Sequence, residues 1–197
     1  MDEIVKAALQ KWPNVPHCYG WLALDARGAW RMRDERTQAL NLPGDKVRNE
    51  ALVGFINRNY QHDQQGRWFF QNGPQRVYVD LETTPYIAHT TSDNGFMLHT
   101  GVPMHEIDHV FLSVEGKLFL RSGDTLAQVD DRDLAACLGK LTISAGPASE
   151  QELMMWLENI DGAASIRFTV SQNNTLEVQR GELSQLMMQF GFVATPR

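Results

Sequence analysis

The fold of this chain is decided by a stretch that recurs along it, first as WLALDARGAWRMR at residues 21–33. Apolar and polar residues alternate in both halves, and residues 25–28 form a polar, glycine-containing turn between them, which is typical of a β-hairpin. Apolar residues then recur at helical spacing over residues 49–60. The stretch therefore predicts a hairpin followed by a helix, whose single apolar face a neighbouring unit has to bury.

Two further copies of this pattern follow. The second is VFLSVEGKLFLR at residues 110–121, with a helix expected over residues 131–138. A looser third copy has strands at residues 166–170 and 176–180 and a helix at residues 182–190. Repetition at this scale indicates the architecture of the protein but does not identify an activity.

The remaining pattern completes an α+β fold of antiparallel β-meanders with short helices. A helix is expected over residues 2–12, and Ser149 with Glu152 forms a capping box that begins another. Further strands are expected on both sides of turns at residues 64–66 and 93–95. We predict three segments, listed by residue number as 1–82, 83–141 and 142–197, the last being a separate helix–hairpin–helix unit or part of the second domain.

Composition excludes several classes of protein. A net charge of −6 and a pI near 5.5 argue against a nucleic-acid polymer or an anionic membrane as partner, because both require a basic face. Cys18 and Cys137 match no metal or redox spacing, which favours two thiols in a reducing compartment. The first residues lack the features of a signal peptide, and no apolar run approaches the roughly 20 residues that span a bilayer. We therefore expect a cytoplasmic protein.

Five motifs across residues 20–140 carry a resemblance to a known family. They are, in order, DARGAW at 25–30, LVGF at 52–55, DQQGRW at 63–68, VYVDLETTPY at 77–86 and VEGKLFLR at 114–121. Their order is similar to the pattern of an uncharacterised bacterial family.

This resemblance implies two duplicated β-rich domains, the second resembling a pleckstrin-homology fold. It also implies a ligand site between the domains, for a nucleotide-like molecule in a signalling role. The chain departs from the family pattern at residues 34–48 and in the added residues 142–197.

The sharpest chemical motif is HEIDH at residues 105–109, an H-E-x-x-H sequence. On a helix, His105 and His109 share a face and bind zinc, with Glu106 as the general base of a hydrolase. Pro103 and the strand expected from Val110 leave room for about two helical turns at most. A zinc-dependent hydrolase is therefore the alternative function, and a polar loop before a strand is the simpler interpretation.

A second set of residues suits a nucleotide pocket. Arg33, Arg76 and Arg121 lie at or near the ends of predicted strands, close to aromatic residues such as Trp30 and Tyr78. A guanidinium binds phosphate and an aromatic ring stacks on a base, so we take these five as candidate ligand-binding residues. In the alternative interpretation these arginines flank the strands and shield the aromatic core.

The leading hypothesis is a non-enzymatic protein that binds a phosphate-bearing or nucleotide-like molecule, or a protein partner, between repeated β-rich units. We expect no catalytic residues, no cofactor and no resident metal. A third possibility is a structural module whose final hairpin pairs with a partner strand or with its own copy.

Overall fold

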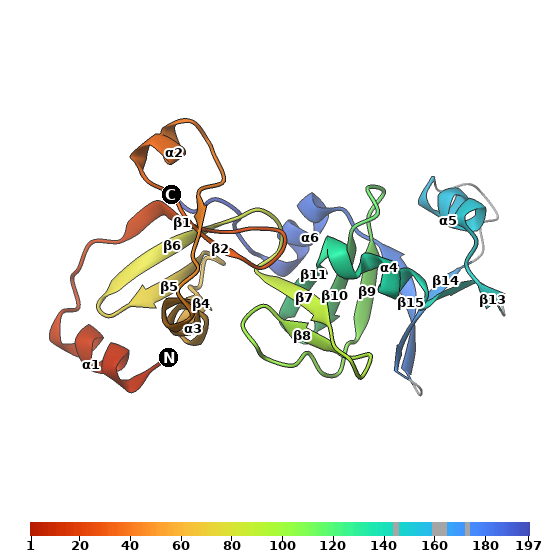
Figure 1. Cartoon of the computed structure of the whole chain (residues 1–197), viewed down its shortest axis with the longest axis horizontal. Coiled ribbons are helices and arrows are strands. Elements are labelled where there is room, and N and C mark those ends of the chain that lie inside the picture. Colours follow the sequence, from red (N-terminus) through yellow and green to blue (C-terminus); the bar gives the residue numbers. More distant parts are fainter. Residues whose placement is uncertain (144–145, 159–164, 172–173) are drawn as a thin grey trace. The chain divides into compact units, whose positions relative to one another are not determined.

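A computed structural model describes residues 1–143, 146–158, 165–171 and 174–197 of the chain. It divides into two compact units (Figure 1). Unit 1 comprises Met1–Pro85 together with Met187–Arg197, and unit 2 comprises Tyr86–Leu186. Each unit contains a β-sheet with short helices, which confirms the α+β class. The three predicted segments stay a prediction.

The described residues of unit 1 form a six-stranded sheet. In spatial order its strands are β3 (Asp45–Lys46), β2 (Trp30–Met32), β1 (Cys18–Leu24), β6 (Gln75–Leu81), β5 (Trp68–Asn72) and β4 (Tyr60–His62). The hairpin expected at residues 21–33 is present as the antiparallel pair β1–β2, and β4–β5 is the hairpin expected around residues 64–66. Strand β1 also pairs with β6 in parallel, a long-range pairing that the hairpin pattern does not contain.

Three helices accompany this sheet: α1 (Glu3–Lys11), α2 (Glu35–Ala39) and α3 (Glu50–Arg58). Helix α3 begins where the Asn49 side chain accepts a 2.9 Å hydrogen bond from the Leu52 N–H. It packs on β5, where the Phe55 and Phe70 rings meet edge to face at 5.4 Å. Its Ile56 is 2% exposed, so this helix covers the apolar face of the sheet. Helix α2 and strand β3 form within residues 34–48, the range in which the chain departs from the family pattern.

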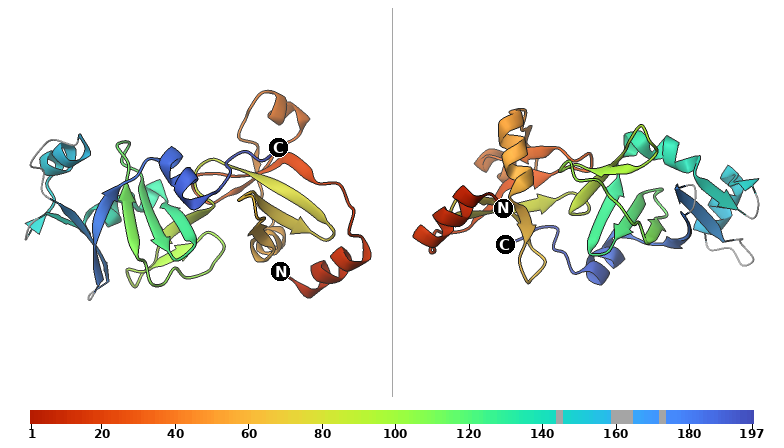
Figure 2. Two further views of the ribbon diagram at one scale, coloured as in Figure 1. Left: turned by 180° about the vertical axis from the view of Figure 1, so that it is seen from behind. Right: turned by 90° about the horizontal axis from the view of Figure 1, so that it is seen from below.

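Residues from the far end of the sequence complete unit 1. The Val193 N–H donates to the Gly66 carbonyl at 3.0 Å, and the Leu81 N–H donates to the Ala194 carbonyl at 2.7 Å. Phe192 is 6% exposed, and Pro196 is also buried. The end marked C accordingly lies beside the strands of unit 1 in every view (Figure 2). We call residues 191–197 the returning segment.

In the part of unit 2 that the structure describes, nine strands form one sheet. In spatial order they are β13 (Gly146–Pro147), β12 (Leu141–Ile143), β14 (Ile166–Ser171), β15 (Asn174–Arg180), β9 (His109–Leu112), β10 (Leu118–Ser122), β11 (Thr125–Val129), β7 (Tyr86–Thr90) and β8 (Phe96–Leu98). The second and third predicted hairpins are the pairs β9–β10 and β14–β15. Residues 172–173, where the turn of the third hairpin is expected, lie outside the described residues. The pairs β15–β9 and β11–β7 are parallel, so this sheet is mixed rather than a purely antiparallel meander.

The helical elements of unit 2 are short: η1 (Asp131–Asp133), α4 (Leu134–Leu138), α5 (Glu150–Leu157) and α6 (Leu183–Phe190), the last of which continues into unit 1. The predicted capping box is confirmed, because Ser149 accepts from the Glu152 N–H and Glu152 accepts from the Ser149 N–H. A continuous apolar core includes Phe168 and Leu120, both 0% exposed. Among the described helices, none is long and apolar enough to cross a membrane.

We predict that Gly66→Ala destabilises unit 1 more than Gly73→Ala does. Both glycines have positive φ angles, 72° and 57°, so each substitution costs about 1–2 kcal/mol in backbone strain. A Cβ on Gly66 would also lie 1.7 Å from the Gly191 carbonyl oxygen, whereas one on Gly73 meets only the Ala8 Cβ, at 3.9 Å. Urea denaturation followed by tryptophan fluorescence measures the difference, since four of the five tryptophans lie in unit 1. Equal losses would show that the returning segment contributes little to stability.

Candidate functional site

One row of side chains crosses three strands of unit 1. Arg31 on β2 pairs with Ala23 on β1, and Ala23 pairs with Asp80 on β6. Successive residues of a strand point to opposite faces, and the next residues in register, Leu24 and Leu81, are buried in the core. The row therefore lies on the sheet face opposite that core, and it brings a cation and an anion to one side.

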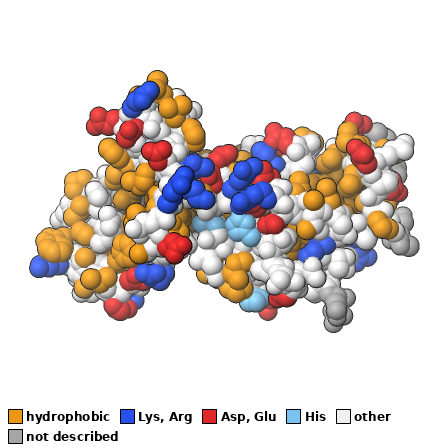
Figure 3. Space-filling model, in the orientation of Figure 1, with side chains coloured by type: hydrophobic (Ala, Val, Ile, Leu, Met, Phe, Trp, Pro, Cys, Tyr) orange, Lys and Arg blue, Asp and Glu red, His pale blue; other side chains and the backbone are white. Residues whose placement is uncertain are grey.

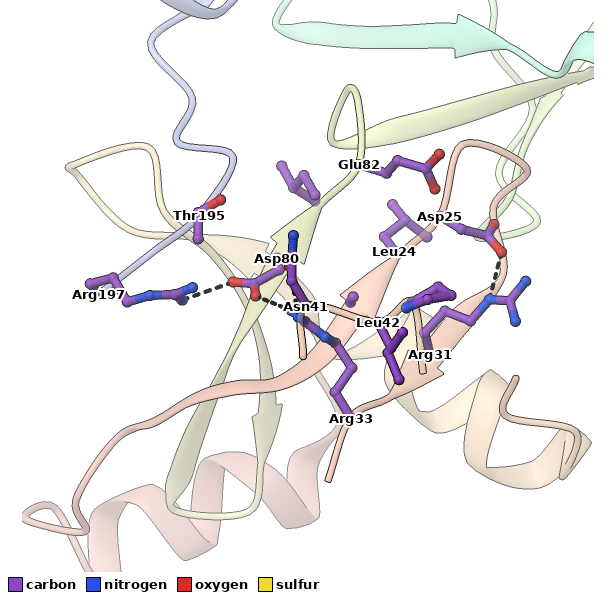
Figure 4. Close-up of a pocket in the computed structure, with 13 residues that line it drawn as sticks. Leu24, Asp25, Arg31, Arg33, Asn41, Leu42, Asp80, Glu82, Thr195 and Arg197 are labelled. Atoms are coloured by element: carbon purple, nitrogen blue, oxygen red, sulfur yellow. Dashed lines mark hydrogen bonds and ion pairs between the residues drawn. The ribbon is translucent and has the colours of Figure 1, made fainter. Parts of the chain in front are cut away.

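A pocket of about 390 Å³ opens above this row (Figure 4). Its charged lining consists of Arg31, Arg33, Arg197, Asp25, Asp80 and Glu82. Its apolar lining includes Leu24, Leu42, Pro43 and Leu81. All of these residues belong to unit 1, and the returning segment supplies Arg197 and Thr195. The pocket thus combines guanidinium groups with an apolar wall, which suits a small organic molecule that carries a charged group.

The most buried charges of the pocket are Arg33 and Asp80. Their side chains are 10% and 12% exposed, and the Arg33 Nη1 donates to the Asp80 carboxylate at 2.5 Å. The Arg33 Nη2 donates to the Asn41 side-chain oxygen at 3.3 Å. The Nε of Arg33 is buried and has no hydrogen-bond partner among the described residues. A buried donor without an acceptor is costly, so this nitrogen leaves the hydrogen bonding of a pocket-lining side chain incomplete within the described residues.

The other two arginines are less enclosed. Arg31 donates from Nε to Asp25 at 2.8 Å, and its side chain is 30% exposed. Asp25 also accepts from the Ala29 N–H at 2.8 Å, so one carboxylate fixes both the hairpin turn and Arg31. Arg197 donates to Asp80 at 3.1 Å and is 62% exposed. On the face drawn in Figure 3, basic and acidic side chains are likewise interspersed.

The five residues that the sequence indicates for ligand binding have different surroundings within their units. Arg33 lines the pocket. Trp30, its neighbour on β2, is 2% exposed and donates from Nε1 to the Asn57 side chain at 2.7 Å. The guanidinium of Arg76 lies 4.6 Å from the centre of the Phe69 ring, which is the shielding role of the alternative interpretation.

The other two residues have structural partners of their own. Tyr78 is 1% exposed and stacks on Tyr19, with ring centres 4.7 Å apart. Arg121 belongs to unit 2, where its Nε donates to the Gly123 carbonyl at 2.8 Å and lies 3.4 Å from Asp108. The part of all five residues in ligand binding stays a prediction.

Tyr78 is tied to a carboxylate with a shifted pKa. Its hydroxyl donates to Asp63 at 3.0 Å, and Arg67 donates to the same carboxylate at 2.8 Å. Burial by itself raises the pKa of Asp63, but the hydrogen bonds from Arg67 and Tyr78 outweigh it and lower the pKa to about 2. Burial is the main cause that raises the pKa of Tyr78. The phenol therefore stays protonated and serves as a donor within the sheet.

The HEIDH motif does not form a zinc-binding helix. Residues 104–108 have no regular secondary structure, and Glu106 adopts a positive φ of 51°. His109 already belongs to strand β9, and Ile107 is 3% exposed in the core of unit 2. Within the described ranges, no group of three His, Cys, Asp or Glu side chains is placed to hold a metal ion. The polar loop before a strand is therefore the interpretation that the geometry supports.

Sequence reasoning missed most of the pocket. Asp80 carried a signal, since a charged residue within the otherwise apolar run VYVDL of a strand needs a partner. Asp25 and Arg31 lie within the first hairpin and were assigned to the turn and the strand alone. Arg197 is 117 positions from Asp80 in the sequence, so no local pattern connects them.

Comparisons with known proteins give a family-model match and a likeness to a solved structure. The family model DUF2944, described as "Protein of unknown function (DUF2946)", matches residues 1–197. The crystal structure of a DUF1285 family protein from Silicibacter pomeroyi DSS-3 is similar, with a TM-score of 0.50 and 11% sequence identity, over 94% of this chain and 98% of that one. This structural likeness concerns the fold. A search of curated proteins finds no match.

We predict that the stabilising effect of Asp63 disappears in acid. Its pKa in the folded protein is about 2, below the ordinary value of 3.8, so its contribution is present above about pH 4 and falls as the pH drops through 2. Asp63→Asn should cost about 2 kcal/mol at pH 7, and the gap from the unaltered protein should shrink toward pH 2. Urea titrations at several pH values measure this gap. The exposed Asp45 provides the control, because Asp45→Asn should change stability by less than about 0.5 kcal/mol. A gap for Asp63→Asn that does not depend on pH would contradict the assignment.

Proposed function

The chain belongs to the DUF2944 family, and we propose that this member binds a small molecule, through an anionic group, in the pocket of unit 1. The observation that supports the proposal is the buried Arg33 Nε, a donor without an acceptor in the described part of the chain. A phosphate or carboxylate oxygen supplies that acceptor with a charge-assisted hydrogen bond.

The shape of the pocket favours a metabolite-sized ligand. A volume of about 390 Å³ falls in the range of roughly 300–1,000 Å³ that small-molecule sites occupy. Arg33 is held in place by Asp80 and Asn41 before any ligand arrives, so little side-chain freedom is lost on binding. Leu42 and Pro43, both exposed, offer an apolar surface to the uncharged part of the ligand. The pocket therefore supports recognition of an organic anion.

Several finer expectations stay proposals alongside this one. They are a nucleotide-like ligand in a signalling role, a protein partner, a cytoplasmic location, and a duplicated architecture whose second domain resembles a pleckstrin-homology fold. The absence of a convincing catalytic set among the described residues favours binding over catalysis. We do not propose the zinc-dependent hydrolase, because His105, Glu106 and His109 do not share a helical face.

The test is a thermal-shift panel of phosphate- and carboxylate-bearing metabolites, nucleotides included. A ligand at about 100 times its Kd adds about 2.7 kcal/mol, and each kcal/mol raises the Tm by roughly 2–4 °C in a chain of this size. Ala23→Leu fills the pocket above strand β1 and leaves every charged group in place, so it should abolish the thermal shift. Arg33→Gln should abolish it as well.

Arg48→Gln is the matched control, since Arg48 is an exposed arginine of unit 1 outside the pocket lining. This variant should keep the shift of the unaltered protein. A panel without any shift, or a shift that survives in the folded Ala23→Leu variant, would overturn the proposal.

A further inference from the structure

We infer that Arg197 selects the ligand: it leaves Asp80 when a phosphate dianion binds and closes on that phosphate. The inference rests on the proposed function and deepens it, because it assigns the pocket to phosphomonoesters rather than to anions in general. Arg197 comes from the returning segment, and its guanidinium approaches Asp80 from the side opposite Arg33 (Figure 4).

The Arg197 side chain can move, whereas the backbone that carries it is held in place. Phe192 and Pro196 are buried, and the Leu81 N–H holds the Ala194 carbonyl at 2.7 Å. The Arg197 side chain is nevertheless 62% exposed. Exposed ion pairs contribute little to stability, so the guanidinium can change partners at small cost. The segment thus presents a mobile cation from a fixed position at the pocket.

Asp80 keeps a cationic partner when Arg197 leaves it. Its carboxylate already pairs with Arg33 at 2.5 Å through one oxygen, while Arg197 contacts the other at 3.1 Å. Removing Arg197 therefore leaves no buried carboxylate without a cation. By contrast, Arg33 is 10% exposed and is bound to Asp80 and Asn41, so it stays in place. Of the two guanidiniums on Asp80, only Arg197 is available for exchange.

The charge of the ligand sets how many donors it requires. The Arg33 Nε provides a single donor, which satisfies one oxygen of a carboxylate or a phosphate. A phosphate dianion has further charged oxygens that need donors, and a guanidinium binds two of them at once. A carboxylate held by Arg33 gains much less from a second guanidinium. Movement of Arg197 therefore favours phosphate over carboxylate.

The test compares phenyl phosphate with benzoate, two probes that share a ring and differ in their charged group. At pH 8 the phosphate ester is a dianion and benzoate a monoanion. Isothermal titration calorimetry of the full chain should show that Arg197→Gln weakens phenyl phosphate about tenfold and benzoate by less than about twofold. Arg48→Gln should change neither affinity by more than about twofold, and both variants should melt close to the unaltered protein.

The outcomes separate the two proposals. If Arg197→Gln binds both probes as the unaltered protein does, while Ala23→Leu binds neither, the inference on Arg197 is wrong and the proposed function stands. An equal loss for both probes also overturns the selection of phosphate. If the unaltered protein binds neither these probes nor any member of the metabolite panel, both proposals fail together.

Discussion

The polar face of unit 1 depends on the ion pair between Arg33 and Asp80. Two charges at 10% and 12% exposure are costly to remove from water, and their mutual attraction offsets that cost only when the geometry is good. The pair connects the end of the first hairpin to strand β6, and Asn41 and Arg197 each donate a hydrogen bond or accept one at this pair. Replacing the pair with apolar residues would close the pocket, which is a physical reason to retain it.

The hairpins of this fold were predictable because they are local. Alternation and a polar turn lie within about a dozen residues, so the β1–β2 and β9–β10 pairs follow from the sequence. The parallel pairs β1–β6 and β15–β9 join strands that are distant in sequence, and hydrophobic alternation carries no information about which distant strand will be the neighbour. The mixed sheets therefore emerged only in the structure.

The candidate site shows the same division. Arg33, which the sequence indicates from its place near a strand end close to an aromatic residue, lines the pocket. Tyr78 and Arg76 fit the same pattern, and in the structure the Tyr78 ring stacks on Tyr19 and the Arg76 guanidinium lies over the Phe69 ring. A pattern of residue types does not show such contacts within the chain. The sequence HEIDH matches the H-E-x-x-H motif. Because Glu106 has a positive φ and His109 belongs to a strand, these residues do not form the helix that zinc binding by this motif requires.

The returning segment also orders events during synthesis. Strands of unit 1 emerge from the ribosome early, but their partners around Val193 and Ala194 emerge after all of unit 2. Contacts between such distant positions require a large loop to close, and this slows their formation. Unit 2 therefore has the opportunity to fold while the Gly66 carbonyl and the Leu81 N–H of unit 1 still lack these partners. The interval in which unit 1 is incomplete, and in which chaperones or aggregation compete for it, therefore lasts until the returning segment has emerged from the ribosome.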